Sequence, residues 1–487
     1  MADSKKFLYP APPELLSSLS IRHALKYMGP GLIVASVTIG SGELVMASRS
    51  GAIFGYTMMW CFLYAGIFKA TQVYCALRHY TLSGEHPMVS WGRIPGPPLW
   101  FPILLTIPTI CVMPIAFSTL PEILGTFIHR LLKMPLEGPS VGAWNHEEFW
   151  LNLWATTTLV GCLALALWSS YDWVERVSSI ILGALVFAVI ISAVIFGPDL
   201  VKILQGMLVP QVQNYEPWIT ENIAYRPLIE RSPWLEIALY LGAVGGGTFD
   251  YIGYVGVIRE KGWGLAGRGS ASREKLEEAT KNKEDLKRAR IWTRAPLLDT
   301  GISFFFVILV TLLFATLGAL ILHPRQLIPD GGEFLTVQEN YLTALHPKLA
   351  LLYRTGVFLA FIGTLYGAFL IYRHTVAECL ISIFKNRVPR ASSPLWRRWV
   401  YSYCFIGGLI LVWLPHSIAG NIIDRLTFST IIGGATTCGL WCFAMLWVDG
   451  IRLPKSLRMG FGLRTIVLIS GLALTGLGLK TIVTYFG

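Results

Sequence analysis

Long apolar stretches separated by short polar loops recur along the whole chain. Each holds about twenty mostly apolar residues, enough for an α-helix to cross a hydrocarbon core of ~30 Å. None shows the strict alternation of a barrel strand, so the pattern predicts an all-α integral membrane protein. We count eleven spans, at residues 30–51, 54–78, 101–128, 149–169, 173–196, 234–258, 298–322, 349–383, 399–415, 426–448 and 463–485. The eighth is too long for one straight crossing, and we expect its helix to extend into water.

The composition agrees with this pattern. Of the 487 residues, 54% are hydrophobic and 14% are charged, whereas a soluble protein has about 25% charged residues. The net charge of +11 does not indicate nucleic-acid binding, because the basic residues gather in particular loops near the lipid bilayer. The most basic loop covers residues 259–296, and those after spans eight and ten are also basic. The positive-inside rule therefore places the N-terminus in the cytoplasm and the C-terminus outside, and we expect a plasma (inner) membrane protein.

The same basic loop has Glu and Lys spacings, between Glu274 and Arg288, that are typical of a solvated helix. The eight cysteines lie within or at the ends of apolar segments and form no CxxC pair, so we expect free thiols. We find no Walker loop and no pattern of a catalytic triad. The sequence therefore predicts neither an enzyme nor a bound cofactor.

The spans are consistent with an internal repeat. We expect residues 1–28 to form a cytoplasmic segment and residues 29–487 to form one transmembrane domain. Two five-helix repeats, at about 29–196 and 234–448, would be followed by an extra helix at 463–485. In that arrangement spans one and six occupy corresponding positions.

In the sequences of spans one and six, glycines interrupt the apolar run and an acidic residue follows them. Span one contains Gly40, Ser41, Gly42 and Glu43, and span six contains the sequence GGGTFD, with Gly247, Thr248 and Asp250. A glycine destabilises a helix interior by about 1 kcal/mol relative to alanine and lets the backbone leave the helix. Two such segments at corresponding positions are typical of the central site of a transporter.

The glycines and acids of these spans also suit purely structural roles. Glycines in membrane helices often allow close helix packing, but packing does not explain a buried carboxylate, which costs at least ~2.5–3.5 kcal/mol at the bilayer centre. Glu43 also suits the positive N-terminus of the second half-helix, where Ser41 is a candidate cap.

Further charged residues lie inside or near the spans. Glu122 in span three is a candidate for proton relay or for a structural ion pair, because desolvation favours its neutral form. Lys69 in span two is expected to neutralise Glu122, Glu43 or Asp250, or else to line a water-filled vestibule. We expect Arg49, Arg373 and Glu378 to be interfacial.

Several segments resemble the Nramp (natural resistance-associated macrophage protein) family of divalent metal transporters. The stretch MGPGLIVASVTIGSGELVMASRSGAIFGYTMMW is similar to that family's first helix and the start of its second. PEILGTF, YDWVER, GMLVP and LLDTGISFF resemble its third helix, its fifth helix, the loop that follows, and the start of its seventh helix. The resemblance implies a LeuT-like fold with inverted repeats and proton-coupled uptake of divalent metals. It also places Glu122 at the family's acid linked to proton movement, while Thr119 replaces a second acid one turn earlier.

The chain departs from this family at the metal site itself. Gly40, Ser41, Gly42 and Glu43 stand where the family has Asp-Pro-Gly-Asn. Phe249, Asp250 and Tyr251 align with Met-Pro-His of the sixth helix, and Thr311 and Thr436 align with polar amides of the seventh and tenth. The thioether that favours soft metals is therefore missing from this alignment.

We expect a secondary transporter that imports a divalent metal cation by alternating access, with proton coupling through Glu122. The expected metal ligands are Glu43 and Asp250, and the site is completed by backbone carbonyls near Gly40 and Gly247 and by the hydroxyls of Thr38, Ser41 and Thr248. An all-oxygen site suits a hard cation such as Mg²⁺, Mn²⁺ or Ca²⁺. The alternative is a LeuT-like transporter of a small organic solute, in which Lys69 replaces a coupling cation.

Overall fold

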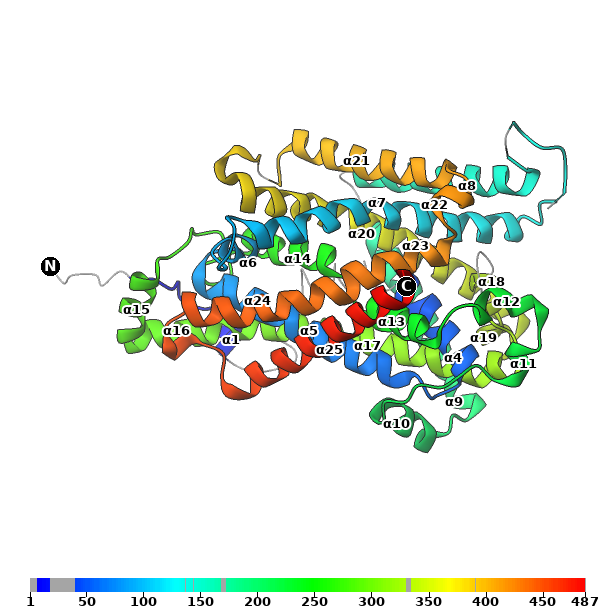
Figure 1. Cartoon of the computed structure of the whole chain (residues 1–487), viewed down its shortest axis with the longest axis horizontal. Coiled ribbons are helices and arrows are strands. Elements are labelled where there is room, and N and C mark those ends of the chain that lie inside the picture. Colours follow the sequence, from blue (N-terminus) through cyan, green and yellow to red (C-terminus); the bar gives the residue numbers. More distant parts are fainter. Residues whose placement is uncertain are drawn as a thin grey trace.

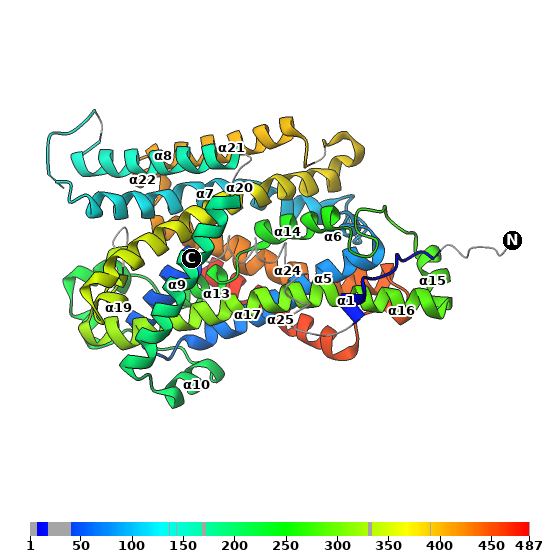
Figure 2. The same cartoon turned by 180° about the vertical axis from the view of Figure 1, so that it is seen from behind.

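The structure is a computed structural model that describes residues 7–17, 40–135, 137–142, 144–167, 172–329, 334–389 and 391–486. Over these residues it contains helices and loops and no β-strand. The long helices are α5 (Met59–Ser83), α7 (Trp100–Leu131), α8 (His146–Leu167), α9 (Asp172–Phe196), α17 (Arg294–Leu317), α20 (Ala350–Phe384), α21 (Pro394–Trp413), α24 (Thr437–Arg452) and α25 (Phe461–Phe486). They run mostly along the length of the molecule, and α9 runs across it (Figures 1 and 2).

Two groups of helices make up the fold. Helices α7, α8, α20 and α21 pack on one another along one side of the molecule (Figure 1). The other group contains α5, α17 and the shorter helices α4 (Ala47–Phe54), α13 (Pro233–Ala243) and α14 (Thr248–Lys261), and α14 packs against α20 of the first group. Helix α9 contacts both α17 and α20 and crosses between the groups (Figure 2). Several different spans therefore meet where the two groups of helices pack against each other.

Part of the expected span pattern is present as long apolar helices. Six helices of the described part are long and apolar enough to cross a membrane, or seven if the bent pair of α9 and α10 (Leu200–Leu208), which meet at 115°, counts as one span. The expected long eighth span is the single 35-residue helix α20, whose length is about 52 Å at 1.5 Å per residue. The count of eleven spans stays a prediction.

The basic loop forms two helices, α15 (Arg273–Lys281) and α16 (Lys283–Trp292). Pairs at i,i+4 support them, because Arg273 Nε lies 2.9 Å from Glu277 Oε1 and Arg288 Nε lies 3.1 Å from Glu284 Oε1. They are separated at Asn282, whose side chain accepts a hydrogen bond from the first turn of α16. The predicted solvated helix is confirmed, but as a helical hairpin.

The N-terminal segment, residues 7–17, lies against this hairpin. The Tyr9 amide donates to Asp285 Oδ1 over 3.0 Å, and Trp292 Nε1 donates to the Pro10 carbonyl over 3.0 Å. Helices α15 and α16 lie at one end of the molecule, and α10, α11 (Pro217–Thr220), α12 (Arg226–Ile229) and α18 (Phe334–Gln338) lie at the other (Figure 1). The N-terminal segment and the most basic loop thus share one side, in agreement with the charge pattern.

A buried carboxylate joins several elements near this end. Glu85, in the loop after α5, accepts hydrogen bonds from Arg93 over 2.7 and 2.8 Å and from Ser90 over 2.8 Å, and Arg452 Nε lies 3.0 Å away. Burial raises the pKa of Glu85, but the Arg93 hydrogen bonds and the Arg452 charge outweigh it and hold this pKa below its ordinary value. Glu85 is therefore held as a carboxylate.

The predicted free thiols are confirmed, since all eight cysteines are unpaired. Seven are buried and Cys111 is exposed. Cys111 shares a face of α7 with the exposed side chains of Ile103, Leu104 and Ile107. Such a continuous apolar stripe is typical of a helix face turned to lipid.

Candidate functional site

Span six is broken at its middle, as predicted. Helix α13 ends at Ala243 and α14 begins at Thr248, with four residues between them outside either helix. Gly245 and Gly246 have φ angles of +73° and +83°, a region in which a side chain is strained. The glycines are therefore needed for the backbone path of the break.

In span one the structure describes the chain from Gly40 onward. Gly40 precedes a π-helical turn, η1 (Ser41–Met46), which continues into α4. A Cβ at Gly42 would lie only 2.4 Å from the Ala243 carbonyl oxygen, so this turn packs directly on the backbone of the span-six break. The part of span one before Gly40, with Thr38, and the Ser41 side chain lie outside the described residues.

The two acids occupy matching positions. Glu43 and Asp250 are each the third residue of a half-helix, and each accepts a hydrogen bond from the backbone N–H of the glycine before it, Gly40 over 3.5 Å and Gly247 over 2.8 Å. Glu43 Oε1 also accepts the Gly245 N–H over 2.8 Å, which joins span one to the break of span six. The alternative role of Glu43 at a positive helix N-terminus is thus present, and Asp250 shares it.

Lys69 contacts the same break through backbone oxygens. Its Nζ donates to the carbonyls of Gly242, Val244 and Gly246 over 2.7, 2.7 and 2.8 Å. An ammonium has three N–H donors, so these carbonyls use all of them. The expected ion pair between Lys69 and Glu122, Glu43 or Asp250 is therefore replaced by a contact with the end of α13.

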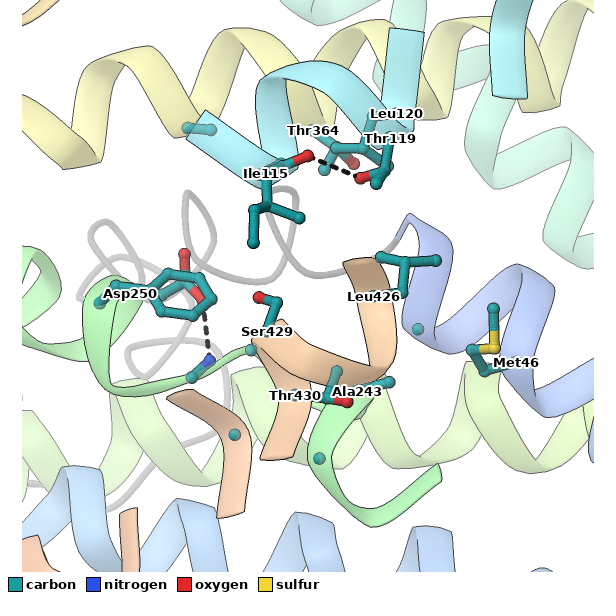
Figure 3. A pocket seen from close by; sticks show the side chains of 18 of the residues that line it. Met46, Ile115, Thr119, Leu120, Ala243, Asp250, Thr364, Leu426, Ser429 and Thr430 are labelled. Carbon is teal, nitrogen blue, oxygen red and sulfur yellow. Dashed lines mark hydrogen bonds between the residues drawn. The ribbon is translucent and has the colours of Figure 1, made fainter. Parts of the chain in front are cut away.

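A cavity of about 90 Å³ lies where spans one, three, six, eight and ten meet, large enough for several water molecules. Its polar lining consists of one carboxylate, Asp250, and the hydroxyls of Thr119, Thr364, Tyr372, Ser429 and Thr430. Figure 3 shows Asp250 on one side of the cavity and Met46 on the other. Asp250 Oδ2 accepts the Gly247 N–H, while Oδ1 is buried without a hydrogen bond of good geometry. Asp250 is therefore the charged group best placed to meet a cargo.

Of the other predicted site residues, Gly247 also lines the cavity, whereas Gly40, Glu43 and Thr248 do not. Both carboxylate oxygens of Glu43 accept backbone N–H groups, and Glu43 is absent from the lining. Thr248 Oγ1 lies 2.7 Å from Thr437 Oγ1. The Thr311 and Thr436 hydroxyls donate to carbonyls of their own helices. The described residues contain no group of three or more His, Cys, Asp or Glu placed to hold a metal. Asp250 and Gly247 are thus the members of the expected set that line the cavity, and Gly42 lines it with them.

Glu122 forms a buried ion pair. Its Oε2 accepts a hydrogen bond from Arg425 on α23 (Ile422–Ser429), and Arg425 also donates to Ser118 Oγ over 2.9 Å. Glu122 Oε1 is buried without a partner. The structural role that the sequence left open for Glu122 is thus present, and its partner is an arginine that the sequence analysis did not single out.

The prediction that Arg49 is interfacial is wrong. Its side chain is 1% exposed, and its Nε lies 3.3 Å from Oε2 of the fully buried Glu236 on α13. Arg231 continues this network to Asp424, over 3.0 Å. A lone acid in the apolar segment LEIALYL was the available signal for Glu236.

Glu378 is also buried rather than interfacial. Its Oε1 lies 2.7 Å from a guanidinium nitrogen of Arg259 on α14, and Arg259 Nε donates to the Tyr80 hydroxyl over 2.8 Å. Arg373, in contrast, is only partly buried. The carboxylate of Glu378 thus joins α20 to α14.

Span ten is one continuous helix with an irregular turn that the sequence analysis missed. A π-helical turn, η8 (Thr430–Thr436), separates α23 from α24. A Cβ at Gly434 would lie 2.2 Å from the Gly242 carbonyl oxygen, so this turn packs directly on the break of span six. No acid follows its glycines, so the pattern that marked spans one and six did not mark this turn.

The amino-acid sequence of the chain is similar to those of known proteins. A family model described as "Nramp: Natural resistance-associated macrophage protein-like" matches residues 31–484. The divalent metal cation transporter MntH of Chromohalobacter salexigens is 23% identical over 76% of this chain and 72% of its own length. Metal transporter Nramp6 of Arabidopsis thaliana is 22% identical over 44% of this chain and 36% of its own.

Solved structures agree in fold. The Eremococcus coleocola manganese transporter, in complex with an aromatic bis-isothiourea compound, superposes with a TM-score of 0.60 at 14% identity, over 98% of this chain and 90% of that one. At this identity the likeness concerns the fold alone.

Proposed function

Because the chain belongs to the Nramp family of multi-pass membrane transporters, we propose that it is a secondary transporter that imports a divalent metal cation by alternating access. The observation that carries the proposal is the cavity beside the break of span six and the irregular turns of spans one and ten, with the Asp250 carboxylate on its wall. Irregular backbone at membrane depth is tolerated where it lines a cavity. The N-terminus and the basic loop then face the cytoplasm, in a plasma (inner) membrane.

Asp250 is the proposed first ligand. The hydroxyl oxygens around it and the small number of acids suit a hard cation, such as Mg²⁺, Mn²⁺ or Ca²⁺, that keeps part of its water shell. Glu43 acts as a second ligand once it releases the Gly245 N–H, which would couple metal binding to movement between spans one and six. Met46 is the one soft donor on the lining, and it lies across the cavity from Asp250 (Figure 3).

Uptake into proteoliposomes tests this function. Vesicles that hold a metal indicator are exposed to Mg²⁺, Mn²⁺ and Ca²⁺ in turn, with and without a pH gradient. We expect saturable uptake of at least one ion, its loss in Asp250→Asn, and a weaker loss in Glu43→Gln. Met46→Leu should leave uptake of a hard cation unchanged.

A matched control is Thr311→Val, because the Thr311 hydroxyl is buried, bonds to its own helix and does not line the cavity. Unchanged uptake in both Asp250→Asn and Glu43→Gln would refute the proposed ligands. An absence of uptake for every ion tested would refute metal transport.

The second candidate cargo is a small organic solute. Apolar groups make up much of the cavity wall, and only one acid lines it. The half-helix N-termini that would bind an anionic group already carry Glu43 and Asp250, so such a solute would be neutral or cationic. Accumulation of an organic solute by vesicles that exclude metals would favour this candidate.

A further inference from the structure

The break of span six encloses a positive charge from this chain itself. The carbonyl oxygens of Gly242, Val244 and Gly246 converge on Lys69 Nζ at 2.7, 2.7 and 2.8 Å. We call these three oxygens the carbonyl cage. The lysine side chain is completely buried, so all of its charge is balanced inside the protein.

The carbonyl cage has the features of a cation site. Gly242 belongs to the last turn of α13, where the helix dipole places its negative end. Val244 and Gly246 follow in the unwound segment, whose carbonyls have no partner within a helix. In transporters with broken helices, unwound carbonyls and half-helix C-termini are the groups that coordinate monovalent cations.

The contacts also explain why the cage matters for the rest of the site. With three carbonyls directed at Lys69, the alternate N–H groups of Gly245 and Gly247 point to Glu43 and Asp250. The Gly245 carbonyl, which lies between the cage carbonyls in sequence, accepts a hydrogen bond from the Tyr251 hydroxyl over 2.7 Å. The position of the ammonium therefore sets the positions of both acids.

We propose that the carbonyl cage is a monovalent-cation site that the Lys69 ammonium occupies permanently. The tethered ammonium does the work of a bound Na⁺ or K⁺, so the protein needs neither ion to order its central break. Lys69 is thus a positioning residue, and its role is the same for a metal cargo and for an organic one.

Thermal unfolding of the purified full-length protein tests the proposal without any transport measurement. The midpoint is measured at equal ionic strength in choline chloride, NaCl, KCl and methylammonium chloride. We expect one midpoint for the wild type in all four salts. Lys69→Ala, which empties the cage, should unfold several degrees lower in choline and regain at least half of that loss in Na⁺, K⁺ or methylammonium.

Two further variants separate charge from hydrogen bonding and from general effects. Lys69→Gln keeps N–H donors but no charge, and we expect a lower midpoint that no salt restores, because its side chain still fills the cage. Lys261→Ala removes an exposed lysine at the end of α14, and its midpoint should not depend on the cation.

Three results would overturn the proposal. They are a folded Lys69→Ala with equal midpoints in all four salts, a wild type that is stabilised by Na⁺ or K⁺ over choline, and a Lys69→Gln as stable as the wild type. The second and third results can be obtained, and would overturn the proposal, even if Lys69→Ala does not fold.

Discussion

Replacing Glu236 by glutamine removes one charge from the most deeply buried ion pair of the structure's described part while nearly preserving side-chain size. Glu236 Oε2 lies 3.3 Å from Arg49 Nε and accepts a hydrogen bond from the Tyr240 hydroxyl over 2.8 Å. The other carboxylate oxygen, Oε1, lies 3.5 Å from Arg231 Nε. The side chains of Arg49 and Glu236 are 1% and 0% exposed. In the variant the Arg49 guanidinium keeps the Pro329 carbonyl but loses the charge of the Glu236 carboxylate.

The expected cost follows from burial. Removing one partner of a buried ion pair costs about 3–5 kcal/mol, because the other charge stays out of water. An unfolding entropy of about 2.1 cal/mol/K per residue over 487 residues amounts to roughly 1 kcal/mol/K. Glu236→Gln should therefore lower the unfolding midpoint by about 3–5 °C.

The chain offers a matched control pair. Arg226 and Glu230 form an ion pair of similar length, 3.2 Å, with side chains 74% and 67% exposed. Such surface pairs contribute about 0–1 kcal/mol, so Glu230→Gln should move the midpoint by no more than about 1 °C. The assay is thermal unfolding in detergent, followed by intrinsic tryptophan fluorescence.

A double variant completes the test. Arg49→Leu with Glu236→Leu replaces both charges by apolar groups, and we expect it to unfold at a higher temperature than Glu236→Gln, since the two buried charges are removed together. A Glu236→Gln midpoint within a degree of the wild type would refute the reasoning. So would a double variant less stable than the sum of the two single losses.

Three further predictions concern packing, pH and coupling. Gly42→Ala should lower the free energy of unfolding by about 1–3 kcal/mol and abolish most metal uptake, because the added Cβ would lie 2.4 Å from a backbone carbonyl oxygen. Gly161→Ala is the control, since the space around its Cβ is open, and it should change neither thermal unfolding nor uptake. The Arg93 contacts hold the pKa of Glu85 below its ordinary value of 4.5, so their contribution to stability is complete above pH 4.5 and is lost as the pH falls through the lower folded pKa. The unfolding midpoint of Glu85→Gln should therefore decrease less than that of the wild type as the pH is lowered. Equal pH profiles for the two proteins would contradict this. If Glu122 carries the coupled proton, Glu122→Gln should take up metal at a rate that no longer responds to a pH gradient; a preserved response would leave Glu122 a structural role only.

Local sequence was sufficient for the features that depend on a few neighbouring residues. Glycines followed by an acid identified the break of span six and the helix starts that precede Glu43 and Asp250, because φ above zero and a helix N-terminus are both local properties. The break of span one stays a prediction. The family resemblance supplied the fold, which the match over residues 31–484 confirms. The π-helical turn at Thr430–Thr436 was missed because no acid follows its glycines.

Contacts between distant segments could not be predicted. Arg49 meets a carboxylate 187 residues away, and Arg259 meets one 119 residues away. Lys69 was expected to seek a carboxylate, but its partners are backbone oxygens, which every residue has and no sequence letter marks. Only the three-dimensional path of the span-six break brings those oxygens together.

The distribution of the thiols makes the natural chain suitable for measuring its own motion. Seven of the eight cysteines are buried, and Cys111 lies on an apolar face of α7 that suits lipid. A charged, membrane-impermeant maleimide therefore has little to react with in the unaltered protein. A cysteine placed at Ser429, on the cavity wall, would report which side of the membrane the cavity opens to, with no need to remove the native thiols first.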